Sequence, residues 1–178
     1  MSPASEPGRR LFFALWPDDL VRARLARVAR AIDQGRKMDA GNLHVTLHFL
    51  GNTPAETQAC VERAAAGVRG RPFELVLSEV GHWPRPQVVW LGPRETPSAM
   101  LDLHTALVEA MRPCGFEPEG RAFHPHVTLA RKVRRLRYAR SVAPIAWRVA
   151  DFCLVESRTT PAGARYQVLR RWALDGDG

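Results

Sequence analysis

The spacing of hydrophobic and polar positions changes repeatedly along the chain, and each change marks a predicted element. Short apolar runs between turn-forming residues predict β-strands, and apolar residues recurring every three or four positions predict amphipathic helices. The strands are expected at 10–16, 42–50, 73–80, 87–91, 126–131, 151–156 and 166–174, and the helices at 18–34, 53–68 and 96–111. Strands and helices interleave while some strands are adjacent, which predicts an α+β protein with antiparallel sheet.

Residues at the helix ends support these assignments. Asp18 or Asp19 can cap the first helix, since a carboxylate accepts hydrogen bonds from the free N–H groups of the first turn. The second begins at 53–56, Thr-Pro-Ala-Glu, which matches a capping box with proline at the first helical position. Pro113 and Gly115 end the third.

No segment has the composition of a linker between independent domains. The 178 residues and the hydrophobic content of 46% are enough for one compact core. We therefore expect residues 1–178 to form a single domain. Residues 1–9 and 175–178 are rich in polar residues and glycine and are expected to be loose ends.

Apolar runs and cysteines suggest a soluble cytoplasmic protein. The run at 11–16 is too short for a signal peptide, and none approaches the roughly 20 apolar residues of a membrane span. Cys60, Cys114 and Cys153 lie far apart without Cys-x-x-Cys spacing. We expect buried, reduced thiols and neither a thiolate metal site nor a disulfide framework.

The charge balance favours an anionic partner. Lys and Arg number 26 against 18 Asp and Glu, for a formal net charge of +8, which attracts polyanions such as RNA. A compositional bias toward arginine would produce the same excess, so charge alone does not identify the partner. The densest basic run, 131–137, fits either a phosphate-facing patch or a solvated loop.

One tetrad occurs twice, once in each half of the chain. His44-Val45-Thr46-Leu47 recurs letter for letter from His126 to Leu129. At roughly one in twenty per residue, such a recurrence by chance is expected in about one chain in a thousand of this length. On a strand, His and Thr at i and i+2 face one side while Val and Leu face the core. Pseudo-twofold packing of the halves would bring both polar pairs to one cleft.

Two histidines and two hydroxyls facing each other suit acid-base chemistry at phosphorus. With an ordinary pKa of about 6.5, one imidazole can accept a proton near neutrality while the other donates one. The hydroxyls of Thr46 and Thr128 can donate hydrogen bonds to phosphate oxygens without adding charge. An in-line displacement uses all four groups, and each positioned proton transfer contributes roughly 10² to 10⁴ in rate.

The paired His-x-Thr-x tetrads resemble the signature of the two-histidine (2H) phosphoesterase superfamily. Within it, the chain resembles the bacterial RNA 2′,3′-cyclic phosphodiesterases, also called the LigT or 2′-5′ RNA ligase family. The similarity extends over nearly the whole chain, at 10–14, 42–47, 88–92, 123–131 and 164–166. The block at 123–131 is the most specific.

This resemblance implies a bilobal fold, with two pseudo-twofold-related antiparallel sheets and outer helices around a central cleft. It implies hydrolysis of a cyclic phosphate to a 2′-phosphate without metal or organic cofactor, with His44 as proton donor and His126 as proton acceptor. Thr46, Thr128 and Arg131 carry over as phosphate or substrate ligands. The implied partner is RNA with a 2′,3′-cyclic phosphate end, such as a tRNA fragment, bound by a monomer.

Alternatives remain for the function and for the other histidines. The same chemistry could act on a small cyclic or 2′-5′ linked nucleotide, ligation could accompany hydrolysis, and a non-catalytic RNA-binding module could keep the cleft. His48 either lines the cleft or is a surface residue at the end of a strand, and His124 either orients the second tetrad's strand or contacts substrate, or does neither. His82 and His104 are expected to be packing or surface residues. Three tryptophans could stack on bases, although aromatic residues in strands are usually core: Trp83, Trp90 and Trp147.

Overall fold

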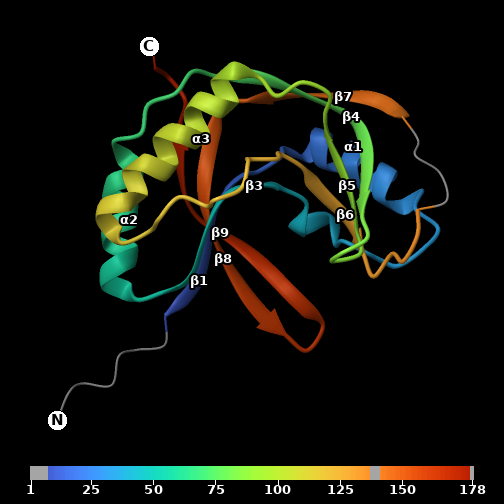
Figure 1. The fold of residues 1–178 in the computed structure, drawn as a ribbon, viewed down its shortest axis with the longest axis horizontal. Coiled ribbons are helices and arrows are strands. Elements are labelled where there is room, and N and C mark those ends of the chain that lie inside the picture. The colour runs from blue at the N-terminus through green and yellow to red at the C-terminus, as the bar shows by residue number, and fades with distance from the viewer. Residues whose placement is uncertain (1–7, 137–140, 177–178) are drawn as a thin grey trace.

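The computed structural model describes residues 8–136 and 141–176, folded as a curved antiparallel sheet flanked by three helices (Figure 1). Arg137 of the basic run lies outside the described residues, as do 1–7 and 177–178 of the two segments expected to be loose. Arg9, within the first of these segments, is the first residue of a strand. In the second, the N–H of Gly176 donates to the carbonyl of Gly70 at 3.0 Å.

The elements follow one another as strand, helix and strand in each half of the chain. The helices are α1 (Asp19–Arg30), α2 (Ala55–Ala66) and α3 (Ser98–Met111), with short 3-10 turns η1 (Ala40–Asn42) and η2 (Arg112–Cys114). The strands are β1 (Arg9–Leu15), β2 (Arg36–Lys37), β3 (Val45–Thr53), β4 (Phe73–Trp83), β5 (Val88–Pro93), β6 (Val127–Arg131), β7 (Ser141–Val149), β8 (Asp151–Thr160) and β9 (Gly163–Ala173).

The strand order shows two related halves. Neighbouring strands follow the order β7-β4-β5-β6-β3-β1-β8-β9, and β2 pairs with β6. Units β1-α1-β3 and β5-α3-β6 occupy matching places on either side of the centre, where Val45 of β3 pairs with Val127 of β6. This confirms the predicted α+β fold, but the two antiparallel sheets that were expected are the pseudo-twofold-related halves of one nine-stranded sheet, because β3 and β6 pair at its centre.

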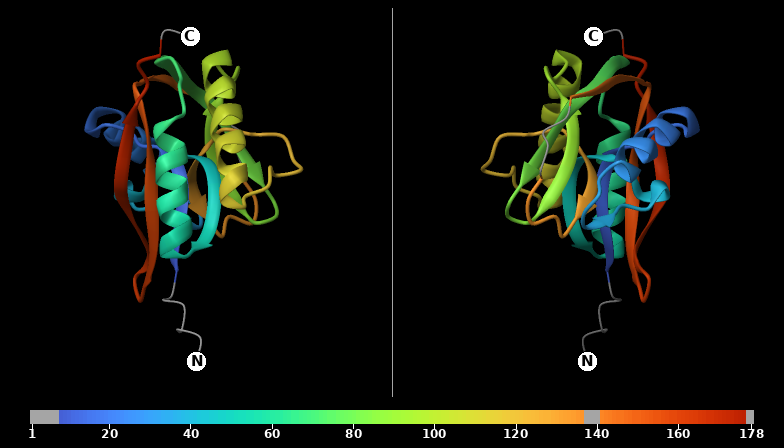
Figure 2. Two further views of the ribbon diagram at one scale, coloured as in Figure 1. Left: turned by 90° about the vertical axis from the view of Figure 1, so that its left-hand side faces the viewer. Right: turned by 90° about the vertical axis from the view of Figure 1, so that its right-hand side faces the viewer.

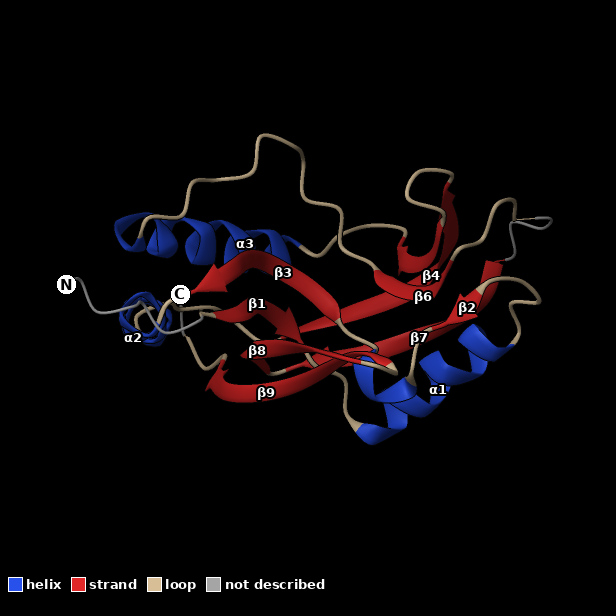
Figure 3. Cartoon of the chain, turned by 90° about the horizontal axis from the view of Figure 1, so that it is seen from below, coloured by secondary structure: helices blue, strands red, loops and turns tan. Residues whose placement is uncertain are grey.

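The helices cover the sheet crosswise. Helix α1 connects β1 to β3 but contacts β6 and β7, and α3 connects β5 to β6 but contacts β3. Helices α2 and α3 lie side by side (Figure 2), at the opposite end of the molecule from α1 (Figure 3). Apolar tetrad members anchor this core, since Val45, Leu47, Val127 and Leu129 are all at most 3% exposed. Among the described residues no helix is long and apolar enough to cross a membrane.

Local signals predicted some element ends correctly and others wrongly. Asp18 caps α1, accepting from the N–H of Val21 at 2.8 Å. The capping box of the second helix is wrong: Thr53 ends β3, its hydroxyl donates to the carbonyl of Gly51, and Pro54 is the residue before the helix. Strand β7 was not predicted, because Pro144 interrupts its pattern. It lies at a sheet edge, where proline is tolerated.

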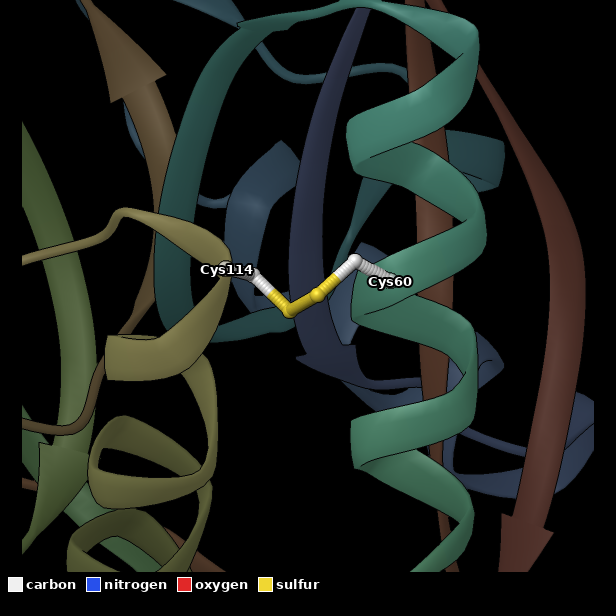
Figure 4. Close-up of a disulfide and its surroundings, with 2 residues drawn as sticks. All are labelled: Cys60 and Cys114. Carbon is white, nitrogen blue, oxygen red and sulfur yellow. A yellow bond between two sulfur atoms is a disulfide. The ribbon is translucent and has the colours of Figure 1, made fainter.

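The expectation of three reduced thiols is wrong for two cysteines. Cys60 of α2 and Cys114 of η2 form a disulfide with a Cα–Cα distance of 5.8 Å (Figure 4). Their separation of 54 residues hid the pairing, which arises because the fold packs η2 against α2. Cys153 is free and buried as predicted, and its thiol donates to the carbonyl of Ala14 at 3.3 Å.

Candidate active site

The two tetrads meet at the centre of the sheet. The valines of the two tetrads, Val45 and Val127, lie opposite each other where β3 pairs with β6. All four polar side chains line one cavity of about 910 Å³. The structure therefore brings together the residues that the repeated tetrad singled out.

Both imidazoles are held at Nδ1 by a main-chain carbonyl two residues earlier. The Nδ1–H of His44 donates to Asn42 at 2.6 Å, and the Nδ1–H of His126 donates to His124 at 2.7 Å. A carbonyl oxygen only accepts, so Nδ1 carries a proton in both rings. Each Nε2 is therefore the atom that can gain or lose a proton.

The neutral form of His44 has a partner for its second nitrogen. Nε2 lies 3.0 Å from Oγ1 of Thr46, and in the neutral ring it accepts a hydrogen bond from that hydroxyl. When Nε2 is protonated it becomes a donor, and the hydroxyl is then free to turn toward another acceptor. The pair can thus exchange one hydrogen-bond pattern for another without moving the strand.

Burial favours the neutral form of both imidazoles. Desolvation lowers the pKa of His44 from 6.5 to about 4, with smaller contributions from the positive charges of His126, Arg131 and Arg22. The carbonyl of Asn42 acts in the opposite direction. Burial also lowers the pKa of His126, again with a contribution from Arg131. An anion in the cavity would raise both pKa values, because it stabilises the charged rings.

Aromatic rings surround His44 on several sides. Trp16 stacks on the imidazole with ring centroids 5.6 Å apart and an interplanar angle of 16°. Phe12 lies at 5.0 Å, and Tyr166 meets the imidazole edge to face at 5.2 Å. These rings explain the desolvation of His44, and their faces can stabilise a protonated imidazole.

Two tryptophans pack against the imidazole of His126. Trp83 meets its ring edge to face at 4.6 Å, and Trp90 lies at 6.4 Å. Trp90 also packs against His124 at 4.7 Å, so it supports the residue whose carbonyl holds His126. Trp147, considered with them as a possible base-stacking residue, is 3% exposed and belongs to the core.

The basic run after the second tetrad contributes one side chain to the cavity among its described members. Arg131 lines the cavity, whereas Arg134 and Arg135 are exposed elsewhere. Val133 is 1% exposed, and its main chain bonds to Gln87 and His82, so the run turns away from the site. Of the two interpretations, a solvated loop fits the exposed Arg134 and Arg135, whereas Arg131 faces the cavity.

The remaining histidines have different environments. His48, His104 and His124 line the cavity, and His82 instead donates from Nε2 to the carbonyl of Val133 at 2.8 Å. His48 is only 5% exposed, because a β-bulge turns it toward the core face of β3. His104, expected to be a packing or surface residue, stacks on Phe123 with centroids 3.9 Å apart. Burial lowers the pKa of both His48 and His104.

Asn42 is a functional residue that the sequence analysis did not identify. Its carbonyl holds His44, and its side-chain amide donates to the carbonyl of Ala164 at 2.7 Å. Its side-chain oxygen accepts from the N–H of Tyr166 at 3.3 Å. Asn42 therefore fixes the first tetrad to β9. The available signal was its place two residues before the tetrad, within a block that resembles the family.

Arg22 stabilises the same corner from α1. Its guanidinium donates to the carbonyls of Ala40, Leu43 and Pro17 at 2.6, 3.4 and 3.0 Å. It also lies 5.4 Å from the ring centroid of Trp16, which stacks on His44. The described residues contain no group of three or more His, Cys, Asp or Glu side chains arranged to hold a metal ion.

Comparison with known proteins shows that the chain has homologous enzymes. Residues 16–161 match the family model described as the 2′-5′ RNA ligase superfamily. A curated protein of Escherichia coli K12 named RNA 2′,3′-cyclic phosphodiesterase is 34% identical, over 96% of this chain and 98% of that protein. A protein of the same name from Archaeoglobus fulgidus is 30% identical, over 90% of this chain and 98% of that protein.

Solved structures give the same result for the fold. The crystal structure of E. coli LigT in apo form superposes with a TM-score of 0.84 at 34% identity, covering 95% of this chain and 99% of that chain. The structure of E. coli LigT complexed with 3′-AMP also superposes with a TM-score of 0.84, at 33% identity and the same coverage. The similarity therefore includes both halves of the sheet.

Proposed function

The chain belongs to the 2′-5′ RNA ligase superfamily, and on this basis we propose that it is an RNA 2′,3′-cyclic phosphodiesterase with His44 and His126 as its acid-base pair. One observation carries the mechanism. Both imidazoles line a single cavity, and main-chain carbonyls bind both Nδ1 atoms, so both Nε2 atoms are available for proton transfer. The names of the relatives support the substrate.

The reaction is a displacement at phosphorus by water. Nε2 of neutral His126 takes a proton from water as its oxygen bonds to phosphorus. The bond from phosphorus to the 3′ oxygen breaks, and Nε2 of protonated His44 gives its proton to that leaving oxygen. The product carries a 2′-phosphate and a free 3′ hydroxyl, and proton exchange with solvent restores both rings. Each transfer is worth roughly 10² to 10⁴ in rate.

Three further side chains would bind the phosphate. The hydroxyls of Thr46 and Thr128 donate to its non-bridging oxygens, and Arg131 stabilises the charge that gathers there in the transition state. The chemistry requires only proton transfer and charge stabilisation, which these residues supply, so we propose that it proceeds without metal. The reverse reaction, attack by a 5′ hydroxyl in place of water, would form a 2′-5′ linkage at the same atoms.

RNA ends fit the site better than a small nucleotide alone. The cavity lining contains more basic than acidic side chains. One acidic residue, Glu119, lines it together with four arginines: Arg10, Arg85, Arg121 and Arg131. This excess of positive charge suits a ligand with more than one phosphate. We propose a cytoplasmic enzyme and expect a monomer, because one chain supplies both tetrads.

Hydrolysis assays in EDTA test this proposal directly. The substrates are a nucleoside 2′,3′-cyclic phosphate and a short RNA with that end, and the enzymes are wild type, His44→Ala and His126→Ala. His82→Ala is the matched control, since His82 does not line the cavity. We expect metal-free formation of the 2′-phosphate, a loss of at least about 100-fold in both tetrad variants, and normal activity in the control. Full activity in either tetrad variant would refute the acid-base assignment.

A further inference from the structure

The hairpin of β4 and β5 forms the wall of the cavity beside His126. Trp83, the last residue of β4, meets the imidazole edge to face with ring centroids 4.6 Å apart. Trp83 pairs with Val88 of β5, and Val88 pairs with Arg131 of β6. Paired residues of antiparallel strands point to the same face of the sheet, and all three line the cavity. The hairpin therefore extends the cavity surface outward from the second tetrad.

The turn of this hairpin brings an uncompensated positive charge to the cavity. Residues 84–87 connect the two strands, and the exposed Arg85 of this turn lines the cavity. Among the described residues, no carboxylate forms an ion pair with Arg85. The acidic lining residue Glu119 is instead paired with Arg121 at 2.8 Å. The guanidinium of Arg85 is thus available to an anionic ligand.

The direction of the proposed reaction identifies the part of an RNA substrate that reaches this hairpin. In a displacement at phosphorus the attacking and leaving oxygens lie roughly in line, on opposite sides of the phosphorus. In our proposal His126 activates the attacking oxygen, and His44 protonates the leaving 3′ oxygen. In ligation the attacking oxygen is the 5′ hydroxyl of a second RNA strand. That strand therefore approaches from the side of His126, where the hairpin lies.

We propose that Arg85 binds the phosphate that follows the first nucleotide of this second strand. The inference rests on the proposed function, because it takes His126 as the base. In ligation the 5′ oxygen bonds to phosphorus and gives its proton to Nε2 of His126, while the bond from phosphorus to the 3′ oxygen breaks and His44 protonates that oxygen. Cleavage of a 2′-5′ linkage reverses each step. Arg85 contacts a phosphate that water lacks, so it favours strand transfer and specifies no base.

Equilibrium binding tests this subsite without requiring turnover. The first pair of ligands is a 2′-5′ linked adenosine dinucleotide and the trinucleotide with one more 3′-5′ phosphodiester after that linkage. Both lack the 3′ hydroxyl beside the linkage, so neither can be cleaved. The second pair is adenosine 2′-monophosphate and the dinucleotide ApA with a terminal 2′-monophosphate, which adds a phosphate on the other side of the reacting phosphorus.

Calorimetric titrations at several salt concentrations would compare wild type, Arg85→Gln and Arg85→Lys. Arg134→Gln is the matched control, because Arg134 is exposed, does not line the cavity and changes the net charge equally. Wild type should bind the trinucleotide about tenfold more tightly than the dinucleotide, the contribution of one charge-assisted hydrogen bond. Arg85→Gln should lose this difference, with a salt slope for the trinucleotide smaller by about 0.7, the value for one phosphate contact. Arg85→Lys should keep most of the difference, and Arg134→Gln should match wild type.

A trinucleotide advantage that persists in Arg85→Gln overturns the subsite, as does wild type that shows no advantage. An equal loss for the second pair of ligands would place Arg85 on the other strand, and an equal loss in Arg134→Gln would show long-range charge alone, so either result also overturns it. Arg85-dependent binding of the trinucleotide by a protein that does not hydrolyse cyclic phosphates would support the subsite and refute the proposed function.

Discussion

Replacing His44 with glutamine should change how the stability of the protein depends on pH. In the folded protein burial lowers the pKa of His44 to about 4, whereas in the unfolded chain it has its ordinary value of 6.5. Between these values the unfolded chain binds a proton that the folded protein does not. The free energy of unfolding therefore falls as the pH drops from about 6.5 to about 4 and is unaffected by His44 above that window.

The size of this effect follows from the shift in pKa. At about 1.4 kcal/mol per unit, the difference between 6.5 and about 4 corresponds to roughly 3 kcal/mol. Part of the ring faces water in the cavity, which screens charge, so we expect about 2–3 kcal/mol. That is a large fraction of the 5–15 kcal/mol that typically stabilises a domain of this kind.

Urea unfolding at pH 8, 6, 5 and 4.5 measures this contribution. At pH 8 the difference between wild type and His44→Gln reports lost packing and hydrogen bonds without any titration, because both folded and unfolded His44 are neutral there. On acidification wild type should lose about 2–3 kcal/mol more than the variant. Parallel loss in both proteins would show that the folded state does not hold His44 neutral, and would refute the desolvation argument.

Three other predictions concern activity and stability. The pH profile of kcat/KM should be bell-shaped with its limbs below the ordinary histidine pKa, since burial lowers the pKa of both imidazoles. The kcat profile should lie at higher pH, because bound phosphate raises both pKa values. Identical flat profiles from pH 5 to 9 would contradict the paired roles. Gly81→Ala should destabilise the protein by about 1–3 kcal/mol in thermal unfolding, because the added Cβ would lie 2.0 Å from the indole of Trp90, whereas Gly120→Ala, with open space around it, should be neutral. Asn42→Ala should lower kcat about tenfold or more with little change in KM in steady-state assays, since it releases the strand that orients an imidazole; a change in KM alone would argue against that role.

Sequence reasoning succeeded where local pattern and three-dimensional position coincide. The duplicated tetrad predicted a shared cleft because alternation on a strand fixes which side chains face together, and the matching strand order then brings the two copies into register. It failed where position depends on distant packing. The disulfide between Cys60 and Cys114 joins segments 54 residues apart, and the bulge that turns His48 toward the core face of β3 depends on the partner strand β1.

The two tetrads are identical, but the environments of His44 and His126 differ, and this difference gives a reason for their different roles as proton donor and proton acceptor. Phe12, Trp16 and Tyr166 desolvate His44, and its lowered pKa, taken alone, suits a base. Yet Coulomb interactions strengthen as the local dielectric falls, so the ring that is most desolvated gains most from an arriving phosphate. In our proposal substrate binding therefore charges His44 and leaves His126 to accept the proton from water. A titration of both imidazoles by NMR, without and with a bound nucleotide, should show the larger upward shift for His44, and a larger shift for His126 would reverse the assignment.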